Sequence, residues 1–498
     1  MSYDDRMSQR IYSSINLQKI AREAMLEEDF IPDPPPAVLA ENNAAENDLK
    51  TKLDSEIVDL RHLFWSSIDN EESRDLDQVE VAERLENEEI RIRVGIADVD
   101  AFVPKNSETD IYAGQNTTSV YTGVQTFPML PRRLSEDLTS LLENKDCLAV
   151  VTDFVVAKDG SVKLNGIYRA LVHNYAKLDY DSVGDFLDGK TNLHTEIAGL
   201  VEQIRLQDEA ADRLRAVRVK EGALEFGTVE ATATQRNGEI YLTVKQKNQA
   251  RYLIENLMIT ANVLMAKFLE ASKYPALKRI VRRPERWQRI VELAADFGEK
   301  LPDEPSSIAL ANFLERRRAA DPVHFPDLSL SVVKLIGAGD YTVDKPGEPE
   351  TDGHFGLAVS DYTHSTAPNR RYADLITQRL VKAAIKNAPA PYSIEELEKI
   401  AARCNDRQSA ARKVERKMRK VVAAQVLSHH IGKTFQGIIT GVSRKGVFVR
   451  LLDPPAEGKI VANEAGADVG DKVTVRLIKT DAENGFIDFE RILKDEKS

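Results

Sequence analysis

The sequence predicts an α+β protein in which a large mixed domain is followed by a small all-β barrel. Strand-like runs such as IRIRVGIADV and stretches with helical periodicity mix between residues 56 and 430 without regular alternation, which is typical of α+β rather than α/β proteins. Residues 433–491 then give about five short β-rich runs broken by Gly, Pro and Asp-rich turns, the pattern of a small Greek-key barrel.

The elements follow one another in a readable order. The segment CLAVVTDFVVAKDGSVKLNGIYRALV predicts a hairpin turning at Asp159-Gly160, because Asp-Gly pairs favour tight turns. Earlier, the prolines and small polar residues of FIPDPPPAVLAENNAAEND predict an arm. Helical periods are expected in residues 192–220, 247–271, 285–298, 369–386 and 393–430. We therefore expect an extended or helical arm over residues 1–55, the mixed domain over 56–430 and the barrel over 431–495.

Composition favours a soluble globular protein. The 498 residues are 42% hydrophobic and 30% charged. No apolar run approaches the roughly 18 residues of a membrane span, and the start MSYDDRMSQR lacks the features of a secretory signal. Cys147 and Cys404 form no metal-ligand pattern. We expect a cytoplasmic location without membrane contact, and the sequence names no protein partner.

Charge is segregated along the chain. The net charge of −12 argues against nucleic-acid binding by the protein as a whole, because Lys and Arg supply affinity for phosphate backbones. Residues 403–420, however, carry eight basic residues against Asp406 and Glu415. This segment predicts a basic helix that contacts a nucleic-acid backbone.

The segment SSIDNEESRDLDQVEVAE gathers three aspartates, Asp69, Asp75 and Asp77, ahead of a strand. Carboxylates a few ångströms apart raise one another's pKa, so a cation is expected among them. Mg²⁺ prefers such oxygen ligands. A calcium loop, with Glu80 twelfth counting from Asp69, fails because its sharp turn needs Gly where this chain has Arg74. A solvated acidic loop stays as the alternative.

Two adjacent arginines form a second candidate feature. HFGLAVSDYTHSTAPNRRYADLITQRL places Arg370 and Arg371 on the first turn of an expected helix, shortly after Pro368. Guanidinium groups there can bind phosphate oxygens in a bidentate manner. A salt-bridged helix start is the alternative.

Several motifs together resemble a known family. TFPMLPRRLSEDLTSL, the aspartate cluster ahead of VGIADVDAFVP, and YTHSTAPNRRYADL occur in the order and approximate spacing of the RNB catalytic domain of the ribonuclease II family. The resemblance spans roughly residues 56–430. GIITGVSRKGVFVRL and GDKVTVRLI resemble the S1-type OB fold that follows this domain. The resemblance implies a 3'-to-5' exoribonuclease that hydrolyses single-stranded RNA to 5'-nucleotides.

The resemblance also implies a metal site. The family's D-x5-D-x-D-D motif holds Mg²⁺ beside the scissile phosphate, with Mn²⁺ as the alternative ion. Asp69, Asp75 and Asp77 match the first three positions, and Asp77 matches the most directly catalytic one. The fourth position is Gln78, which offers a neutral carbonyl oxygen in place of a charged ligand. Metal affinity should therefore fall unless a nearby acid compensates, the candidates being Glu71, Glu72 and Glu80.

Further residues match positions that contact RNA in the family. Arg370 matches an arginine that stabilises charge on the phosphate, and Glu415 an acidic residue near the terminal nucleotide. Other matches are expected to line the RNA path, the aromatic ones by stacking on bases, namely Tyr121, Tyr180, Phe226, Glu255 and Arg371. Core packing is the alternative for the aromatic residues, and Arg371 is expected to support packing as well. His364, in the YTH segment, is expected to fix loop geometry rather than to act as a base.

Two expectations concern the rest of the protein. Too few residues precede Asp69 for the cold-shock barrels that relatives carry, so the RNA clamp should reduce to the basic helix and the barrel. In that barrel, Phe435 and Phe448 stack on bases or belong to the core.

Two other functions stay open. One is a non-catalytic RNA-binding protein of the same fold, disabled at Gln78, and the other an acidic scaffold that binds proteins through residues 1–50.

Overall fold

The computed structural model describes residues 16–493 except 46–51, 53, 54, 194, 196, 228, 229, 237, 238, 246, 323, 348–352 and 445. Its central sheet has the strand order β1-β8-β2-β3-β4-β7, and β7 also pairs with β8. β8 runs parallel to β1 and β2, and the other pairs are antiparallel. These strands are β1 (Val58–Asp59), β2 (Trp65–Asp69), β3 (Gln78–Arg84), β4 (Ile90–Ala97), β7 (Asp146–Val156) and β8 (Val162–Asp179).

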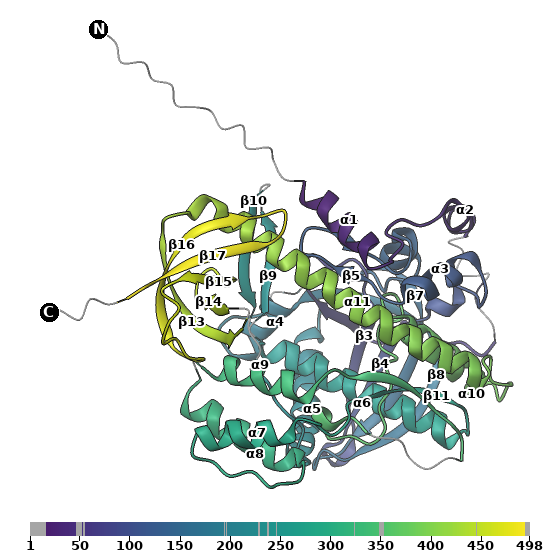
Figure 1. Cartoon of the computed structure of the whole chain (residues 1–498). Helices are drawn as coiled ribbons and strands as arrows, with labels where there is room; N and C mark the ends of the chain where they lie inside the picture. The colour runs from purple at the N-terminus through teal and green to yellow at the C-terminus, as the bar shows by residue number, and fades with distance from the viewer. Residues whose placement is uncertain are drawn as a thin grey trace.

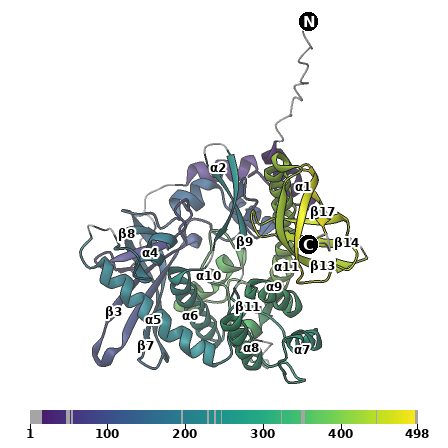
Figure 2. The same ribbon diagram turned by 90° about the vertical axis from the view of Figure 1, so that its left-hand side faces the viewer.

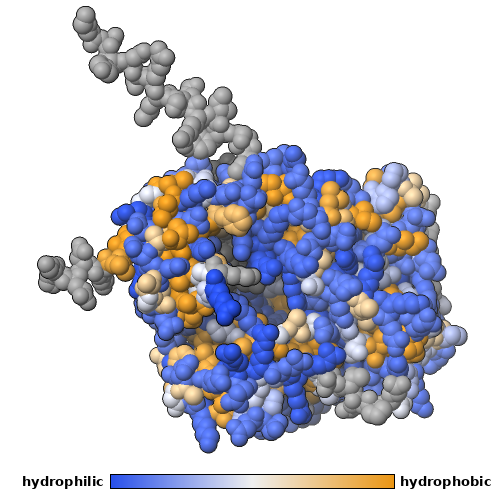
Figure 3. Space-filling view, in the orientation of Figure 1, coloured by the Kyte–Doolittle hydropathy of each residue, from blue (hydrophilic) through white to orange (hydrophobic). Residues whose placement is uncertain are grey.

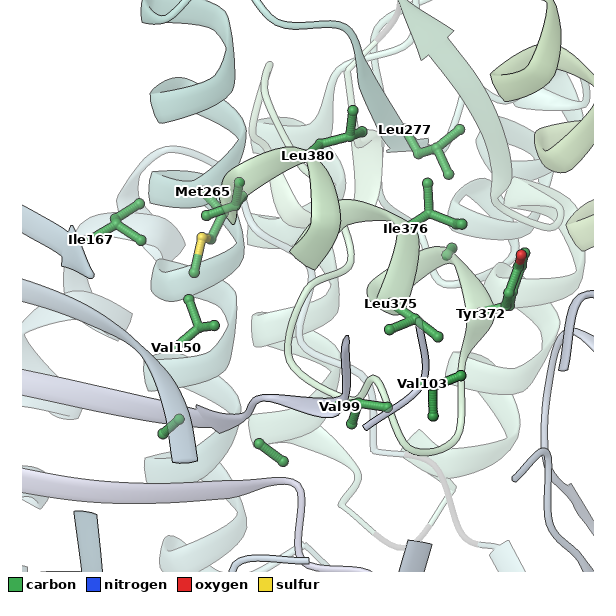
Figure 4. Packing of buried hydrophobic residues seen from close by; sticks show 14 of the residues in the cluster. Val99, Val103, Val150, Ile167, Met265, Leu277, Tyr372, Leu375, Ile376 and Leu380 are labelled. Carbon is green, nitrogen blue, oxygen red and sulfur yellow. The ribbon is translucent and has the colours of Figure 1, made fainter. Parts of the chain in front are cut away.

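Apolar side chains fill both faces of this sheet. In β4 every residue but Arg91 is buried, which explains why its sequence is apolar at nearly every position. On one face Ile92 and Val94 pack against helices that follow β8. On the other, Val150 joins the cluster that Figure 4 shows around Leu375.

Three helices cover the first of these faces, and Figure 2 shows two of them, α5 and α6, beside the sheet strands. They are α4 (Tyr180–Leu187), α5 (Leu200–Lys220) and α6 (Gln249–Ala271). By length and composition α6 could cross a membrane, contrary to our expectation that no segment could. It is a core helix instead, because 67% of its most apolar window is buried inside the protein.

The longest helix leads from the mixed domain into the barrel. α10 (Tyr372–Ile385) is followed by α11 (Ile394–Leu427), which begins with a capping box between Ser393 and Glu396. Figure 1 shows α1 (Leu17–Glu27) lying along α11. The buried face of α1 includes Met25, which packs against α11. Part of the expected N-terminal arm is therefore a docked helix.

The other elements complete the mixed domain. Near the N-terminus are α2 (Pro36–Ala44) and α3 (Glu108–Asn116), and a helical group with its own apolar core comprises α7 (Trp287–Asp296), α8 (Ser307–Ala320) and α9 (Phe325–Ile336). Two short hairpins are formed by β5 (Val120–Tyr121) with β6 (Thr126–Phe127) and by β9 (Glu230–Arg236) with β10 (Glu239–Lys245). β11 (Ala276–Ile280) and β12 (Asp340–Asp344), which lie on either side of this helical group in the sequence, form a further two-stranded antiparallel sheet.

The C-terminal strands close into a barrel in the order β13-β14-β15-β17-β16, as expected. They are β13 (Thr434–Ser443), β14 (Gly446–Leu451), β15 (Glu457–Ala462), β16 (Lys472–Asp481) and β17 (Phe486–Ile492). Phe435 packs against the barrel core, whereas Phe448 is half-buried outside that cluster. Arg450 forms an ion pair with Asp327 of α9, which ties the barrel to the mixed domain. Figure 3 shows apolar surface gathered over the barrel.

The structure confirms the α+β class, the hairpin at Asp159-Gly160 and the terminal barrel. One placement was wrong. Arg370 and Arg371 precede α10 rather than forming its first turn, since the helix begins at Tyr372. The backbone there is held by neighbours instead, because Ser119 donates its N–H to the carbonyl of Arg370. The expected domain boundaries stay predictions.

Candidate active site

The loop between β2 and β3 carries the three aspartates and is fixed by backbone hydrogen bonds. Ser140 Oγ accepts from the N–H of Leu76 at 2.9 Å and donates to the carbonyl of Arg74 at 2.6 Å. The N–H of Ala97 donates to the carbonyl of Asp77 at 3.0 Å. The loop therefore holds its acidic side chains in a defined orientation without help from a ligand.

Asp77 and Arg370 form the centre of the site. The Asp77 side chain is buried, and its Oδ2 accepts from Arg370 Nε at 3.0 Å while Oδ1 accepts from the N–H of Asn369 at 3.2 Å. Burial raises the pKa of Asp77 to about 7, despite the opposing positive charge of Arg370. Among the described residues, the Nη groups of Arg370 make no hydrogen bond. With 41% of its side chain exposed, Arg370 keeps these groups available to a ligand.

Asp75 and Asp69 lie within electrostatic reach of this pair. Burial raises the pKa of Asp75, and the negative charge of Asp69 adds to the effect. Asp69 Oδ1 accepts from Ser73 Oγ at 3.0 Å, so this side chain also braces the loop. The structure thus brings the three aspartates that the sequence singled out into one electrostatic cluster.

This donor set fits a hard divalent cation, because it consists of carboxylate oxygens that repel one another and includes a buried one. The carboxylates are not already arranged around one ion position. In the described part of the chain, no three His, Cys, Asp or Glu side chains already converge closely enough to hold an ion. Gln78, the fourth expected ligand, is 8% exposed and begins β3.

Tyr121 lies beside the centre because its strand runs next to the two arginines. Thr118 forms an isolated bridge with Arg371, and the backbone then continues into β5. The N–H of Tyr121 donates to Glu415 Oε1 of α11 at 3.2 Å. Tyr121 is 45% exposed. Its hydroxyl lies close enough to Arg370 and the aspartates for their charges to act on it. An exposed ring beside the centre is suited to stacking on a planar ligand.

Tyr180 lies on the other side of Asp69, at the first position of α4. The guanidinium of Arg251 stands 4.3 Å from the centre of its ring. Arg251 also donates to Asn70 Oδ1 at 3.0 Å, which links α6 to the aspartate loop. Sequence reasoning did not identify Arg251, whose role depends on contacts across 181 positions of sequence.

Phe226 and Glu255 line a separate cavity of about 280 Å³. Glu255 is paired there with Lys247 at 2.5 Å, whose ammonium also lies 5.2 Å from the ring of Tyr252. The sequence analysis missed Tyr252, although it lies three residues before Glu255 on one helix and hence on the same face. The cavity combines aromatic, acidic and basic groups.

Several basic side chains near the site have acidic partners within the protein. Arg371 donates to Asp374 Oδ1 at 2.6 Å, so its guanidinium is engaged within the protein, as a packing role requires. The basic helix is partly covered by the arm, where Lys413 pairs with Glu28 and Lys417 with Glu27. The acidic end of α1 therefore partly neutralises this helix, and its contact with a nucleic-acid backbone stays a prediction. His364 shares a hydrogen bond with the hydroxyl of Tyr341 at 2.8 Å, which orients its loop.

The fold and the site together define a class of protein: an α+β domain with a carboxylate-and-arginine centre, followed by an OB-type barrel. The chain belongs to the RNB family. The RNB domain model matches residues 57–387, and the model of the RNase II-type exonuclease C-terminal S1 domain matches residues 433–492. Nucleases of this family are metal-dependent.

Named relatives agree with this assignment. The chain is 28% identical over 501 residues to ribonuclease R 1 of Lactococcus lactis and 30% identical over 475 residues to ribonuclease R of Escherichia coli. It covers 60% and 57% of their lengths, and these matches cover 94% and 87% of this chain. The structure resembles RNase R of Mycoplasma genitalium in complex with double-stranded RNA, with a TM-score of 0.85 and 25% identity over 96% of this chain and 84% of the other.

Proposed function

We propose that this chain is a 3'-to-5' exoribonuclease that hydrolyses single-stranded RNA to 5'-nucleotides with Mg²⁺, Mn²⁺ being the alternative ion. Membership of the RNB family and the likeness to ribonuclease R support the reaction class. One observation carries the proposal, namely the ion pair between the buried Asp77 carboxylate and the partly exposed Arg370 guanidinium. A cytoplasmic location is proposed with it, since RNA turnover takes place there.

A divalent ion held by Asp69, Asp75, Asp77 and Gln78 would supply a Lewis acid that activates water and stabilises the leaving oxygen. Arg370 contributes through its two Nη groups, which are suited to a bidentate contact with the scissile phosphate. Its Nε stays with Asp77, so the guanidinium approaches the phosphate in a fixed orientation. Charge that develops on the phosphate therefore meets a preorganised donor.

The flanking aromatic residues position the RNA end. Tyr121 presents an exposed ring next to Arg370, and Tyr180 presents a partly buried ring near Asp69. Stacking on such rings tolerates any base, which suits an enzyme that removes nucleotides one after another. Glu415 accepts the backbone N–H of Tyr121 and so supports the ring that receives the terminal base. Phe226 and Glu255 line the cavity where we place nucleotides further from the 3' end.

A second candidate function follows from Gln78. If its neutral amide leaves the centre without a bound metal, the same residues would bind RNA without cleaving it. The scaffold function has less support, because the described part of the arm packs its apolar face on α11 of the same chain.

One experiment separates the two RNA functions. The full chain is incubated with 5'-labelled single-stranded RNA and Mg²⁺, and products are resolved on a denaturing gel alongside a native gel shift. A ladder of progressively shorter 5'-labelled products supports the exonuclease. A shifted but unshortened strand supports the non-catalytic binder and rejects the proposed activity. A 3'-phosphorylated RNA serves as a control, since a blocked 3' end should delay shortening from that end.

A further inference from the structure

Strand β3 carries a second buried acid close to the metal centre. Gln78 and Glu80 are two positions apart on this strand and pair with Ile96 and Val94 of β4. Side chains two residues apart leave the same face of a strand. Glu80 therefore projects beside Gln78, the position at which the family motif has its fourth aspartate.

Glu80 lacks partners for its charge. Its exposed fraction is 0%, and neither carboxylate oxygen has a hydrogen-bond partner among the described residues. Ser66, directly opposite on β2, has an unpaired buried Oγ, and Gln207 of α5 an unpaired buried Oε1. Several unpaired oxygens in one buried region are costly unless a cation or water binds between them.

The nearby charge is of the wrong sign to satisfy this carboxylate. Asp69 lies close enough to Glu80 for the two carboxylates to repel each other. Both carboxylates also lie close enough to Tyr180 for their charges to act on its hydroxyl. A cation between Asp69 and Glu80 would remove the repulsion and provide the missing partner.

The other acids considered as substitutes are less suitable. Glu71 and Glu72 are both exposed, unlike Glu80. Lys177 Nζ donates to the carbonyl of Glu71 at 2.7 Å and to that of Ser73 at 2.6 Å, which holds this part of the loop in place. Of the three substitutes considered for Gln78, only Glu80 combines complete burial with unpaired oxygens.

We propose that Glu80 is the fourth carboxylate of the metal centre and binds the same divalent cation as Asp69, replacing the charge that Gln78 lacks. A glutamate is one methylene longer than an aspartate, which lets a carboxylate on position 80 reach toward the space beside position 78. The amide oxygen of Gln78 then serves as a neutral ligand between two charged ones. This inference rests on the proposed function, because it requires a cation at the aspartate loop.

The test measures metal binding directly. Mn²⁺ binding to the full chain is followed by electron paramagnetic resonance of the free ion, with the Mn²⁺-induced shift in melting temperature as a second readout. We expect Glu80→Gln to weaken Mn²⁺ binding by more than about tenfold, since even loss of an outer partner of a metal ligand costs about 10- to 100-fold. Unchanged affinity in a folded Glu80→Gln variant would mean that Glu80 is a protonated structural acid, and would overturn the inference.

Moving the charge provides an independent test. Glu80→Leu should lose Mn²⁺ affinity, and adding Gln78→Asp to that variant should restore it, because the carboxylate returns to the motif position. Failure of Gln78→Asp to restore binding contradicts the inference. Thr152→Val is the matched control, since Thr152 is equally buried in the same sheet with an unpaired hydroxyl. It should leave Mn²⁺ affinity unchanged, and an equal loss in this control would show that the effect is unspecific and reject the inference.

A third variant distinguishes this inference from the proposed function. If Asp69→Asn leaves Mn²⁺ binding intact, no ion binds at the aspartate loop and the proposed metal centre itself is wrong. If Asp69→Asn weakens binding while Glu80→Gln does not, the centre stands and only the role of Glu80 is rejected.

Discussion

Arg370 Nε donates to Asp77 Oδ2 at 3.0 Å across 293 positions of sequence, and this contact joins the two motifs on which the site depends. The ion pair is buried on the aspartate side and open on the arginine side. One carboxylate thereby orients a guanidinium whose remaining donors face a ligand. Each half of the pair leads to a different expected result.

Asp77→Asn should stop RNA shortening and spare RNA binding. The substitution keeps the size of the side chain but removes the negative charge from the centre, where a cation is needed for hydrolysis. The amide can still accept the N–H of Asn369, so the loop should keep its shape. Rates on 5'-labelled RNA and a gel shift measure the two properties separately. Wild-type turnover in this variant would show that Asp77 is not catalytic.

Arg370→Lys should lower the cleavage rate by about 10²–10³-fold, the usual loss when one donor to a developing charge is removed. Lysine keeps the positive charge but cannot contact Asp77 and a phosphate with one planar group. Single-turnover rates at saturating enzyme isolate this step from binding. Arg289→Lys, on the exposed face of α7, is the matched control and should cleave at the normal rate.

Tyr121→Ala should weaken binding of the RNA 3' end by roughly 5- to 150-fold, because a base–aromatic stack contributes about 1–3 kcal/mol. Tyr121→Phe keeps the ring and should bind normally. Fluorescence anisotropy with a short RNA measures both affinities at one fixed salt concentration. Equal affinities for all three proteins would assign Tyr121 to packing instead of stacking.

Met25→Ala should loosen the contact between α1 and α11. Met25 is 1% exposed in their shared core, and such truncations cost about 2–5 kcal/mol. We expect faster amide hydrogen exchange in residues 17–27, because local opening of the docked helix becomes easier. Leu26→Ala, at a 53% exposed position of the same helix, is the control. Similar exchange in both variants would contradict this packing.

Acid should destabilise the protein partly through His354. Burial and the positive charge of Arg279 lower the pKa of His354 to about 4, whereas an unfolded histidine titrates near pH 6.5. Between these values the unfolded chain binds more protons. The contribution of His354 to stability is therefore present above pH 6.5 and is lost as the pH falls toward 4.

His354→Asn should flatten this part of the pH profile by up to about 1.4 kcal/mol per pH unit. Asparagine can still accept the N–H of Leu357, which His354 Nδ1 accepts at 3.1 Å. Denaturant unfolding at pH 7, 6 and 5 provides the comparison with the wild-type protein. Parallel profiles would mean that the pKa of His354 is the same in the native and unfolded states, and would contradict this prediction.

The contribution of local sequence is clearest in the barrel and at the aspartate loop. Turn residues and alternating apolar positions predicted five strands after residue 433, and a closed barrel is found. The motif spacing identified Asp69, Asp75 and Asp77 as one cluster. Both signals are local, since they depend on residues within a strand, a turn or a loop.

Contacts between distant segments were harder to predict. The charge of residues 403–420 indicated a helix that contacts a nucleic-acid backbone, but it did not reveal that Lys417 pairs with Glu27, 390 positions away. The apolar length of α6 is explained by its burial beside α5, which no single helix reveals. Arg251 contacts the aspartate loop from α6, and no local pattern in the sequence indicates that this helix lies there.

The sequence by itself determined which residue types this protein has for chemistry: three spaced aspartates, two adjacent arginines and the aromatic residues between them. The tertiary structure alone decided which of them meet. It pairs Arg370 with Asp77, engages Arg371 internally and buries Glu80 with no hydrogen-bond partner among the described residues. The physical reason is that spacing along a chain fixes periodicity and local turns, whereas burial and charge pairing depend on segments that approach only when the whole chain has folded.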